Sequence, residues 1–209
     1  MKLKVTTPLR EIEGKMLIAI SKHLNIKLKN IEKDLTFSVY NLMYQALTGS
    51  QETQSIISGQ LKSELGIVDA DSQLSEIFKA IVHATEVTIT KARVKAKGVS
   101  MTLRISAVPF DLSAMGAIGS YKTEKGTTIP WFEWLTSIGD RVIVRDYEIE
   151  AGHPKHSRTG DAIMISGRKG WRVPPQFAGT KSDNFVTRAV DGILPPLEKI
   201  IIKKVQDKI

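Results

Sequence analysis

The spacing of apolar residues changes near residue 85, and this change limits the folds open to the chain. Before it, apolar residues recur at steps of three and four, which places them on one face of a helix. Four segments follow this rule: 8–24, 35–47, 50–66 and 69–84. After it, 87–110 alternates in the way a strand does. Helices followed by strands favour an α+β fold over alternating α/β.

Local signals predict where two of these helices begin and end. Ser50 is a candidate N-cap, since its hydroxyl can accept a bond from a free backbone amide of the first turn. Gly66 suits a left-handed residue that closes the same helix. For the segment that follows, Asp71 or Ser72 is the predicted cap.

Two hairpins are predicted in the second half of the chain. Gly98 indicates a turn inside 87–110, so the two halves of this segment should pair. The second hairpin would join 161–166 to 170–174 through the turn "GRKG". A strand is predicted at 141–151 and a short helix at 129–140, with Pro130 in its first turn.

Three consecutive regions follow from these patterns. They are a helical region at 1–86, a sheet region at 87–181 with a Gly-rich loop at 111–128, and a C-terminal helix at 182–209. Together they read as one compact domain with arms. Ser182 or Asp183 should cap the last helix, and Pro195 and Pro196 should kink or interrupt it.

The chain is basic, with 30 Lys and Arg against 22 Asp and Glu and a net charge of +8. Such a protein is attracted to polyanions. Lys91, Arg93, Lys95 and Lys97 would lie on one strand face, roughly 6–7 Å apart, a spacing that can follow a phosphate backbone. The same ladder is also typical of a solvated edge strand.

The sequence contains little that indicates a catalytic or metal-binding site. The chain has no cysteine, which excludes disulfides, thiolate metal sites and a cysteine nucleophile. His153 and His156 lie near Asp161, but zinc would need a third ligand such as His83, and nothing in the sequence places one there. There is no G-x-S-x-G motif.

A cation-dependent nuclease would need clustered carboxylates. Asp146, Glu148 and Glu150 share one face of the predicted strand, although an exposed strand edge explains them equally. "SGRKGW" lacks the spacing of a phosphate-binding loop. We therefore expect no enzyme activity, no cofactor and no metal. No apolar run approaches the ~20 residues that span a bilayer, so no membrane role is expected.

Three motifs carry a family resemblance: "SRTG" at 157–160, "GWRVPPQFAGT" at 170–180 and "NFVTRA" at 184–189. With them, 129–190 resembles the tail-completion and neck proteins of tailed bacteriophages. The resemblance implies a non-catalytic virion protein, made in the host cytoplasm, that forms a ring at the head–tail junction with six- or twelve-fold order. Other neck, connector and tail proteins would be its partners, and genomic DNA would pass through the lumen.

The resemblance also suggests roles for particular residues. Five are candidates for subunit interfaces: Trp131, Trp134, Arg158, Phe177 and Phe185. Crowded aromatic residues are common in interface centres, although most often they form a core. The basic ladder would face DNA or the lumen. The alternative is a basic DNA-binding protein that acts through the 87–108 hairpin.

The turn motifs have predicted structural roles of their own. Thr159 and Gly160 should make a tight turn. Pro174 and Pro175 should fix a rigid bend before Phe177.

Overall fold

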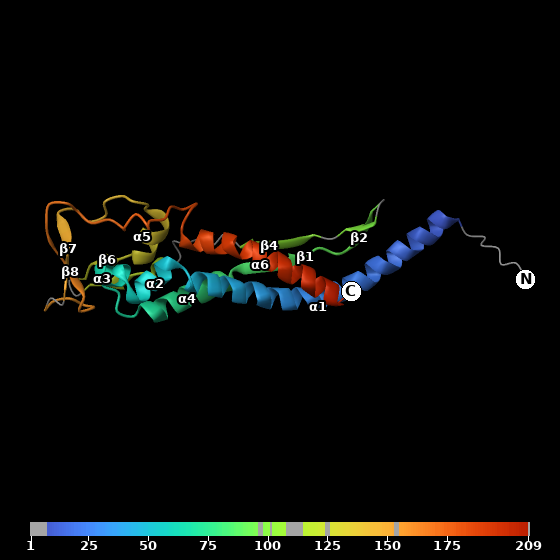
Figure 1. Cartoon of the computed structure of the whole chain (residues 1–209), viewed down its shortest axis with the longest axis horizontal. Coiled ribbons are helices and arrows are strands. Elements are labelled where there is room, and N and C mark those ends of the chain that lie inside the picture. The colour runs from blue at the N-terminus through green and yellow to red at the C-terminus, as the bar shows by residue number, and fades with distance from the viewer. Residues whose placement is uncertain are drawn as a thin grey trace, which may run out of the picture. The chain divides into compact units, whose positions relative to one another are not determined.

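The computed structural model describes residues 8–95, 98–100, 102–107, 115–123, 126–152 and 155–208. These residues form helices and short antiparallel strand pairs joined by turns and irregular segments, which confirms the α+β class. The helices are α1 (Leu9–Thr48), α2 (Gln51–Ser58), α3 (Gln60–Leu65), α4 (Ala70–His83), α5 (Trp131–Ser137) and α6 (Phe185–Lys208) (Figure 1). The strands are β1 (Thr85–Ile89), β2 (Arg93–Lys95), β3 (Gly98–Ser100), β4 (Leu103–Ala107), β5 (Tyr121–Lys122), β6 (Thr128–Ile129), β7 (Tyr147–Ala151) and β8 (Ala162–Ser166).

The chain divides into two compact units that do not follow the three consecutive sequence regions. Unit 1 comprises Met1–Tyr40, Thr85–Val108 and Pro195–Ile209, and unit 2 comprises Asn41–Ala84 and Pro109–Leu194. Helices α1 and α6 each contribute residues to both units. A compact unit is therefore not a continuous piece of sequence here.

Helix α1 joins the two segments predicted as helices at 8–24 and 35–47. The residues between them are helical as well, because Leu28 and Ile31 continue the buried stripe that leads to Leu35. No glycine or proline interrupts 15–48. A single helix of 40 residues is the result.

The segment predicted as one helix at 50–66 forms two, α2 and α3. Both predicted ends are confirmed: the Ser50 hydroxyl accepts a bond from the Thr53 amide, and Gly66 is left-handed with φ 65°. The break falls at Gly59, whose backbone is extended. A Cβ there would lie 2.9 Å from the Ser55 Cα, so the chain can pass this close only with glycine.

Helix α4 begins earlier than predicted. Its N-cap residue is Asp69, with no side-chain capping bond, so the prediction of Asp71 or Ser72 is wrong. Starting the helix at Ala70 places Ala70, Leu74 and Ile77 on one buried face. Burial of this face therefore had more influence on where the helix begins than the preference of Asp71 or Ser72 for a capping position.

The first hairpin forms as predicted, with β1 paired to β4 and β2 paired to β3. Lys95 is opposite Gly98, so the chain reverses at the predicted place. The register changes along the hairpin, because Ile89 pairs with Leu103 whereas Arg93 pairs with Ser100. Three residues, 90–92, separate these paired positions on one side of the hairpin, whereas two separate them on the other, as in a β-bulge.

Ala92, in this bulge, is bonded to α1 within unit 1. Its amide donates to the Asn25 side-chain oxygen at 2.7 Å, and its carbonyl accepts from the Asn25 amide at 3.1 Å. The Ser21 hydroxyl donates to the same carbonyl at 2.7 Å. The Asn25 side chain thus supplies the two bonds that a partner strand would otherwise supply.

The second hairpin differs from the prediction. Strand β8 pairs with β7 from Tyr147↔Ser166 to Ala151↔Ala162, rather than with 170–174. Trp171 instead forms an isolated bridge with Val144. Regular pairing stops between the Val144–Trp171 bridge and the β7–β8 pair. Asp146 and Gly170, which lie between them, both have positive φ, 59° and 91°, and this backbone conformation breaks the strand. The strand predicted at 141–151 is for the same reason regular only from Tyr147.

The predicted loop at 111–128 contains a short antiparallel pair, β5 and β6, with Tyr121 opposite Ile129. Residues 111–114 and 124–125 of this loop lie outside the described residues. The described part places Tyr121 beside α3, where its hydroxyl donates a hydrogen bond to the Leu65 carbonyl.

Helix α6 is capped by Asn184, not by Ser182 or Asp183. The Asn184 side-chain oxygen accepts bonds from the Val186 and Thr187 amides at 3.0 and 3.1 Å. Its amide nitrogen donates to the Thr180 carbonyl, so the cap is also tied to the preceding turn. The helix continues through Pro195 and Pro196, so they do not interrupt it, and a kink at these prolines stays a prediction.

Candidate interface pocket and basic hairpin

Three of the five predicted interface residues form the core of unit 2. Trp131 is 0% exposed, Phe185 2% and Phe177 9%. Phe132 links the first two, with ring centroids 5.8 Å from Trp131 and 6.0 Å from Phe185, both edge-to-face. In this fold their side chains are therefore packing residues, and they offer no surface to a partner.

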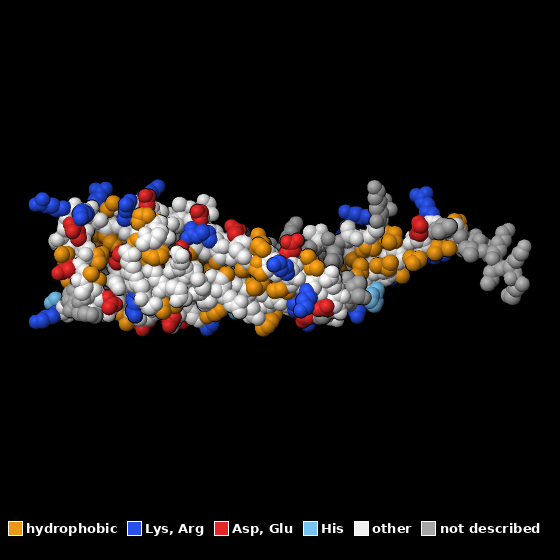
Figure 2. All heavy atoms as spheres, in the orientation of Figure 1, with side chains coloured by type: hydrophobic (Ala, Val, Ile, Leu, Met, Phe, Trp, Pro, Cys, Tyr) orange, Lys and Arg blue, Asp and Glu red, His pale blue; other side chains and the backbone are white. Residues whose placement is uncertain are grey.

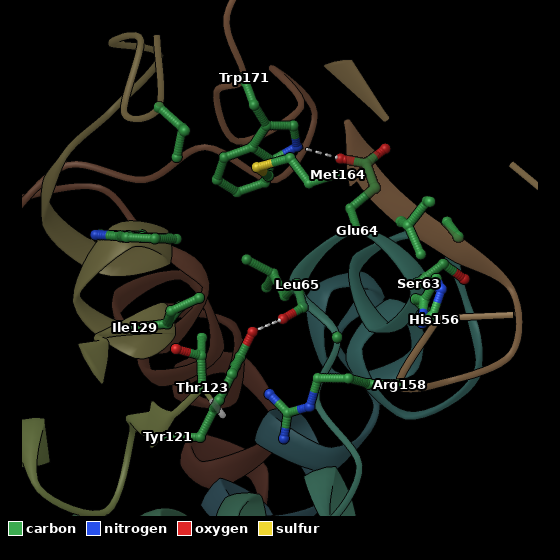
Figure 3. A pocket seen from close by; sticks show the side chains of 15 residues that line it. Ser63, Glu64, Leu65, Tyr121, Thr123, Ile129, His156, Arg158, Met164 and Trp171 are labelled. Atoms are coloured by element: carbon green, nitrogen blue, oxygen red, sulfur yellow. Dashed lines mark hydrogen bonds between the residues drawn. The ribbon is translucent and has the colours of Figure 1, made fainter. Parts of the chain in front are cut away.

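The other two, Trp134 and Arg158, line the same pocket of unit 2. Its volume is about 420 Å³, and its walls come from α3, β5, β6, α5, β8 and the segments around His156 and Trp171 (Figure 3). Apolar side chains form much of the lining, among them Leu65, Ile129 and Met164. The pocket is lined by residues more than a hundred positions apart in the sequence.

One wall of this pocket is built from two tryptophans and a carboxylate. The rings of Trp134 and Trp171 are 5.7 Å apart. The Trp171 indole N–H donates to the Glu64 carboxylate at 2.8 Å, which fixes the ring against α3. A rigid aromatic wall offers a large contact area at low cost in side-chain entropy.

The opposite side of the pocket is built around Tyr121 (Figure 3). Its hydroxyl donates a hydrogen bond to the Leu65 carbonyl. The Arg158 guanidinium carbon lies 4.2 Å from the centre of the Tyr121 ring, a cation–π arrangement. Burial raises the pKa of the Tyr121 phenol, and the positive charge of Arg158 offsets part of that rise.

Arg158 gives this pocket an exposed positive charge. Arg158 is exposed, and no carboxylate in the described ranges forms an ion pair with it. The only contact partner described for its guanidinium is Tyr121. The pocket therefore combines apolar and aromatic walls with one exposed cation, Arg158, and one carboxylate, Glu64, which accepts the Trp171 indole N–H.

The turn motifs take their predicted shapes. Gly160 has φ 83°, consistent with the tight turn. The Phe177 and Ala178 amides both donate to the Pro174 carbonyl, at 2.8 and 3.1 Å, so the bend before the buried Phe177 is confirmed. Gly179 has no room for a side chain, since a Cβ would lie 2.4 Å from the Leu135 carbonyl oxygen.

The basic ladder does not form one continuous strand face. Lys91, Arg93 and Lys95 are all exposed, but Lys91 lies in the bulge while the other two lie in β2. Lys97 lies outside the described residues. Three exposed cations within five positions still make this part of the hairpin strongly basic.

Asp146, Glu148, Glu150 and the two histidines, His153 and His156, are the candidate metal ligands in the sequence. Within the ranges described, no group of three or more His, Cys, Asp and Glu side chains is arranged to hold a metal ion. The Glu148 carboxylate accepts a bond from the Arg168 amide at 3.0 Å. His156 is exposed at the pocket, and His153 lies outside the described residues.

Sequence reasoning did not identify Tyr121, Glu64 or Trp171 as pocket residues. Trp171 carried a signal, because it is one of 3 tryptophans and lies in a quoted motif. Tyr121 fell in a segment predicted to be a loop, and Glu64 reads as an ordinary polar position of a helix. Only the tertiary fold brings these three residues together at the pocket.

No family model matches the chain. Neither a curated protein nor a solved structure matches it significantly. Among the helices described, none has the length and apolar character required to cross a membrane.

Proposed function

We propose that this protein is a structural virion protein of the phage neck, of the tail-completion or tail-terminator type. It forms a ring that joins the tail tube to the head connector, and it has no catalytic role. Its partners are further copies of itself and the adjacent neck, connector and tail proteins. Genomic DNA passes through the lumen of the ring.

The observation that supports this proposal is the convergence of the family-like motifs on one pocket. Arg158 comes from "SRTG", Trp171 from "GWRVPPQFAGT", and Trp134 from the helix that precedes both. Residues at the mouth of a partly open, aromatic pocket are typical anchors of protein interfaces. In a ring, one patch of each subunit meets a different patch of the next, so a pocket that receives a neighbour's segment fits this geometry.

The test uses a phage that carries this gene. When the gene is removed, electron microscopy should show full heads and complete tails that are not joined. Complementation with Arg158→Glu should restore few joined particles, whereas the matched reversal Lys169→Glu, at an exposed residue that does not line the pocket, should restore them. Intact virions after removal of the gene would contradict the proposal.

A second candidate function is binding of duplex DNA through the hairpin. The exposed Lys91, Arg93 and Lys95 favour it, because none forms an ion pair with a carboxylate in the part of the chain that is described. Replacing all three by alanine should then weaken binding and reduce its dependence on salt. The control is the triple alanine variant of Lys22, Lys29 and Lys33, exposed lysines of α1 in the same unit.

A further inference from the structure

Strand β7 has one edge that no described strand covers. Among the described strands, it pairs only with β8. The Gly152 amide donates to the Asp161 carbonyl at 2.7 Å, so the even-numbered residues of β7 bond toward β8. The backbone groups that point away from β8 then belong to three residues: Tyr147, Ile149 and Ala151. An open edge of this kind can accept one more strand.

The side chains along this edge are acidic. Glu148 and Glu150 lie on one face of β7, and neither forms an ion pair within the described part of the chain. Glu150 is exposed, and Glu148 accepts one bond from the Arg168 amide. The exposed cations Arg145, Arg168 and Lys169 lie near the start of β7, outside the paired strands.

Strand β2, in unit 1, has an open edge of the opposite charge. It pairs only with β3 among the described strands, and its three residues, Arg93, Val94 and Lys95, are all exposed. Side chains alternate along a strand, so the two cations share one face. The Ala92 backbone bonds to α1, and alternation directs the Val94 backbone to the same side of the hairpin. No bond from Val94 to α1 is described, and Figure 1 shows the end of β2 separated from that helix.

The two units differ in charge in the same sense as the two strands. Unit 1 contains 17 Lys and Arg against 7 Asp and Glu, whereas unit 2 contains 13 against 15. Figure 2 shows Lys and Arg side chains at the surface around β2, and side chains of both charges around β7. Opposite charges on two open edges favour contact between them.

We propose that β2 of one copy of this chain adds to the open edge of β7 of a second copy, in antiparallel orientation. This contact rests on the ring proposed above, since it joins one patch of each subunit to a different patch of the next. Charge pairing between copies, rather than burial within the chain, then fixes the register of β2. The register consists of three opposed pairs: Val94–Ile149, Arg93–Glu150 and Lys95–Glu148.

Backbone bonding and charge together select the antiparallel orientation. In an antiparallel pair, residues whose backbone groups face each other lie directly opposite, which matches Val94 with Ile149. In a parallel pair, Val94 would lie opposite a glutamate, and the cations of β2 would fall on the apolar face of β7. The antiparallel form also brings Val94, 40% exposed, toward Tyr147, 41% exposed.

Like charges exclude the pairing of identical strands. Two copies of β7 paired about Ile149 would place Glu148 opposite Glu150. Two copies of β2 would place Arg93 opposite Lys95. Like charges directly opposite each other destabilise a strand pair, so each edge disfavours itself and accepts the other.

The first test exchanges one charge pair in the full-length chain. Glu150→Arg and Arg93→Glu should each weaken self-association about tenfold or more, as measured by analytical ultracentrifugation. A chain that carries both changes should recover most of the association, because the pair is restored with its charges exchanged. The controls are Glu133→Arg and Lys33→Glu, at exposed residues of α5 and α1, and they should have little effect.

Three results of this test would overturn the proposal. One is a parent chain that is monomeric. Another is a loss in each single variant without recovery in the double variant, because the two residues would then act separately. The third is a set of variants that all associate like the parent while Arg93→Glu alone lowers binding to duplex DNA. In that case the cations of β2 bind DNA rather than a second copy.

Cysteine cross-linking tests the register and the partner. The chain has no cysteine of its own. When Val94→Cys and Ile149→Cys chains are mixed and oxidised, a disulfide-linked dimer should form, because directly opposite residues of antiparallel strands lie within disulfide reach. Neither variant should cross-link by itself. An internal disulfide in a chain that carries both changes, with no dimer in the mixture, would place the contact within one chain and contradict the proposal.

Failure of this contact can be distinguished from failure of the neck function. If removal of the gene leaves heads and tails unjoined while the charge variants associate like the parent, only this contact is wrong. If virions are intact without the gene, the neck function is wrong, and recovery in the double variant would still support the contact.

Discussion

Unit 1 and unit 2 hold their backbones in place by different means. In unit 2, buried aromatic rings contact one another from α4 through α6 to α5, in the series Phe78, Phe185, Phe132 and Trp131. In unit 1, polar side chains of α1 bond to the backbone of the hairpin, from Ser21 and Asn25 to Tyr40. Packing thus dominates one unit, and specific polar bonds position the other. This difference makes distinct predictions for each.

The largest effect is expected at the centre of the aromatic core. Trp131→Ala should lower the free energy of unfolding by about 3–5 kcal/mol, because the side chain is fully buried and leaves a large cavity. Denaturant unfolding followed by circular dichroism measures this. Phe37→Ala, at a residue 68% exposed, should change stability by less than about 0.5 kcal/mol. Similar losses in both variants would remove the distinction between core and surface aromatics.

The corresponding test of unit 1 is Asn25→Ala. It leaves the Ala92 amide without the partner that lies at 2.7 Å, and we expect a loss of about 1–3 kcal/mol. Hydrogen exchange at 90–92 should accelerate, while exchange in α4 and α5 should not change. Asn30→Ala, at an exposed position of the same helix, is the control. Unchanged exchange at 90–92 would show that the hairpin does not depend on this side chain.

A polar bond also matters inside unit 2, at the start of α6. Asn184→Ala removes two capping bonds and should cost about 0.5–2 kcal/mol. Asn184→Asp keeps the capping oxygen and should recover part of the loss. Because Asn184 also donates to the Thr180 carbonyl, recovery should be incomplete. Full recovery would mean that only the helix cap matters.

The smallest effect is expected at Tyr121. Tyr121→Phe removes the bond to the Leu65 carbonyl and should cost about 1 kcal/mol at neutral pH. The pKa of the phenol is raised above 10.0 in the folded state, so its contribution is present below pH about 10 and is lost as pH rises through the folded pKa. The stability difference between the two proteins should therefore shrink above pH about 10, as measured by urea unfolding. A constant difference would contradict this role of burial.

Periodicity predicted the helices well because burial of one face is recorded directly in the sequence, as Leu74, Ile77 and Phe78 show. It did not predict the break at Gly59, since the apolar spacing continues across it. The partner of β8 was also missed: a turn signal identifies the nearest segment, whereas the real partner β7 lies across the longer connection that contains the "SRTG" turn. Asn184 caps α6 while its side chain also bonds to the Thr180 carbonyl, and the residue preferences for capping positions do not include such a contact.

The candidate site was predicted only in part, for a related reason. Trp134 and Arg158 were identified, and the structure places both at the pocket. Trp131 lies in the same aromatic-rich segment as Trp134, and Phe185 lies in the motif "NFVTRA", but both are buried. Sequence composition marks an aromatic residue as important without saying whether it faces the core or a partner.

The bulge at 90–92 has a consequence for how this hairpin tolerates changes in length. The extra residue shifts the alternation of side chains between the two faces of the strand by one position. On the side nearer β1, buried Val87 and the Ala92 bonds fix the register, so deletion of one residue would turn apolar side chains outward. Beyond it, all three residues of β2 are exposed, and no buried face opposes a change of register. Insertions and deletions should therefore accumulate at the tip of this hairpin and be excluded from its base.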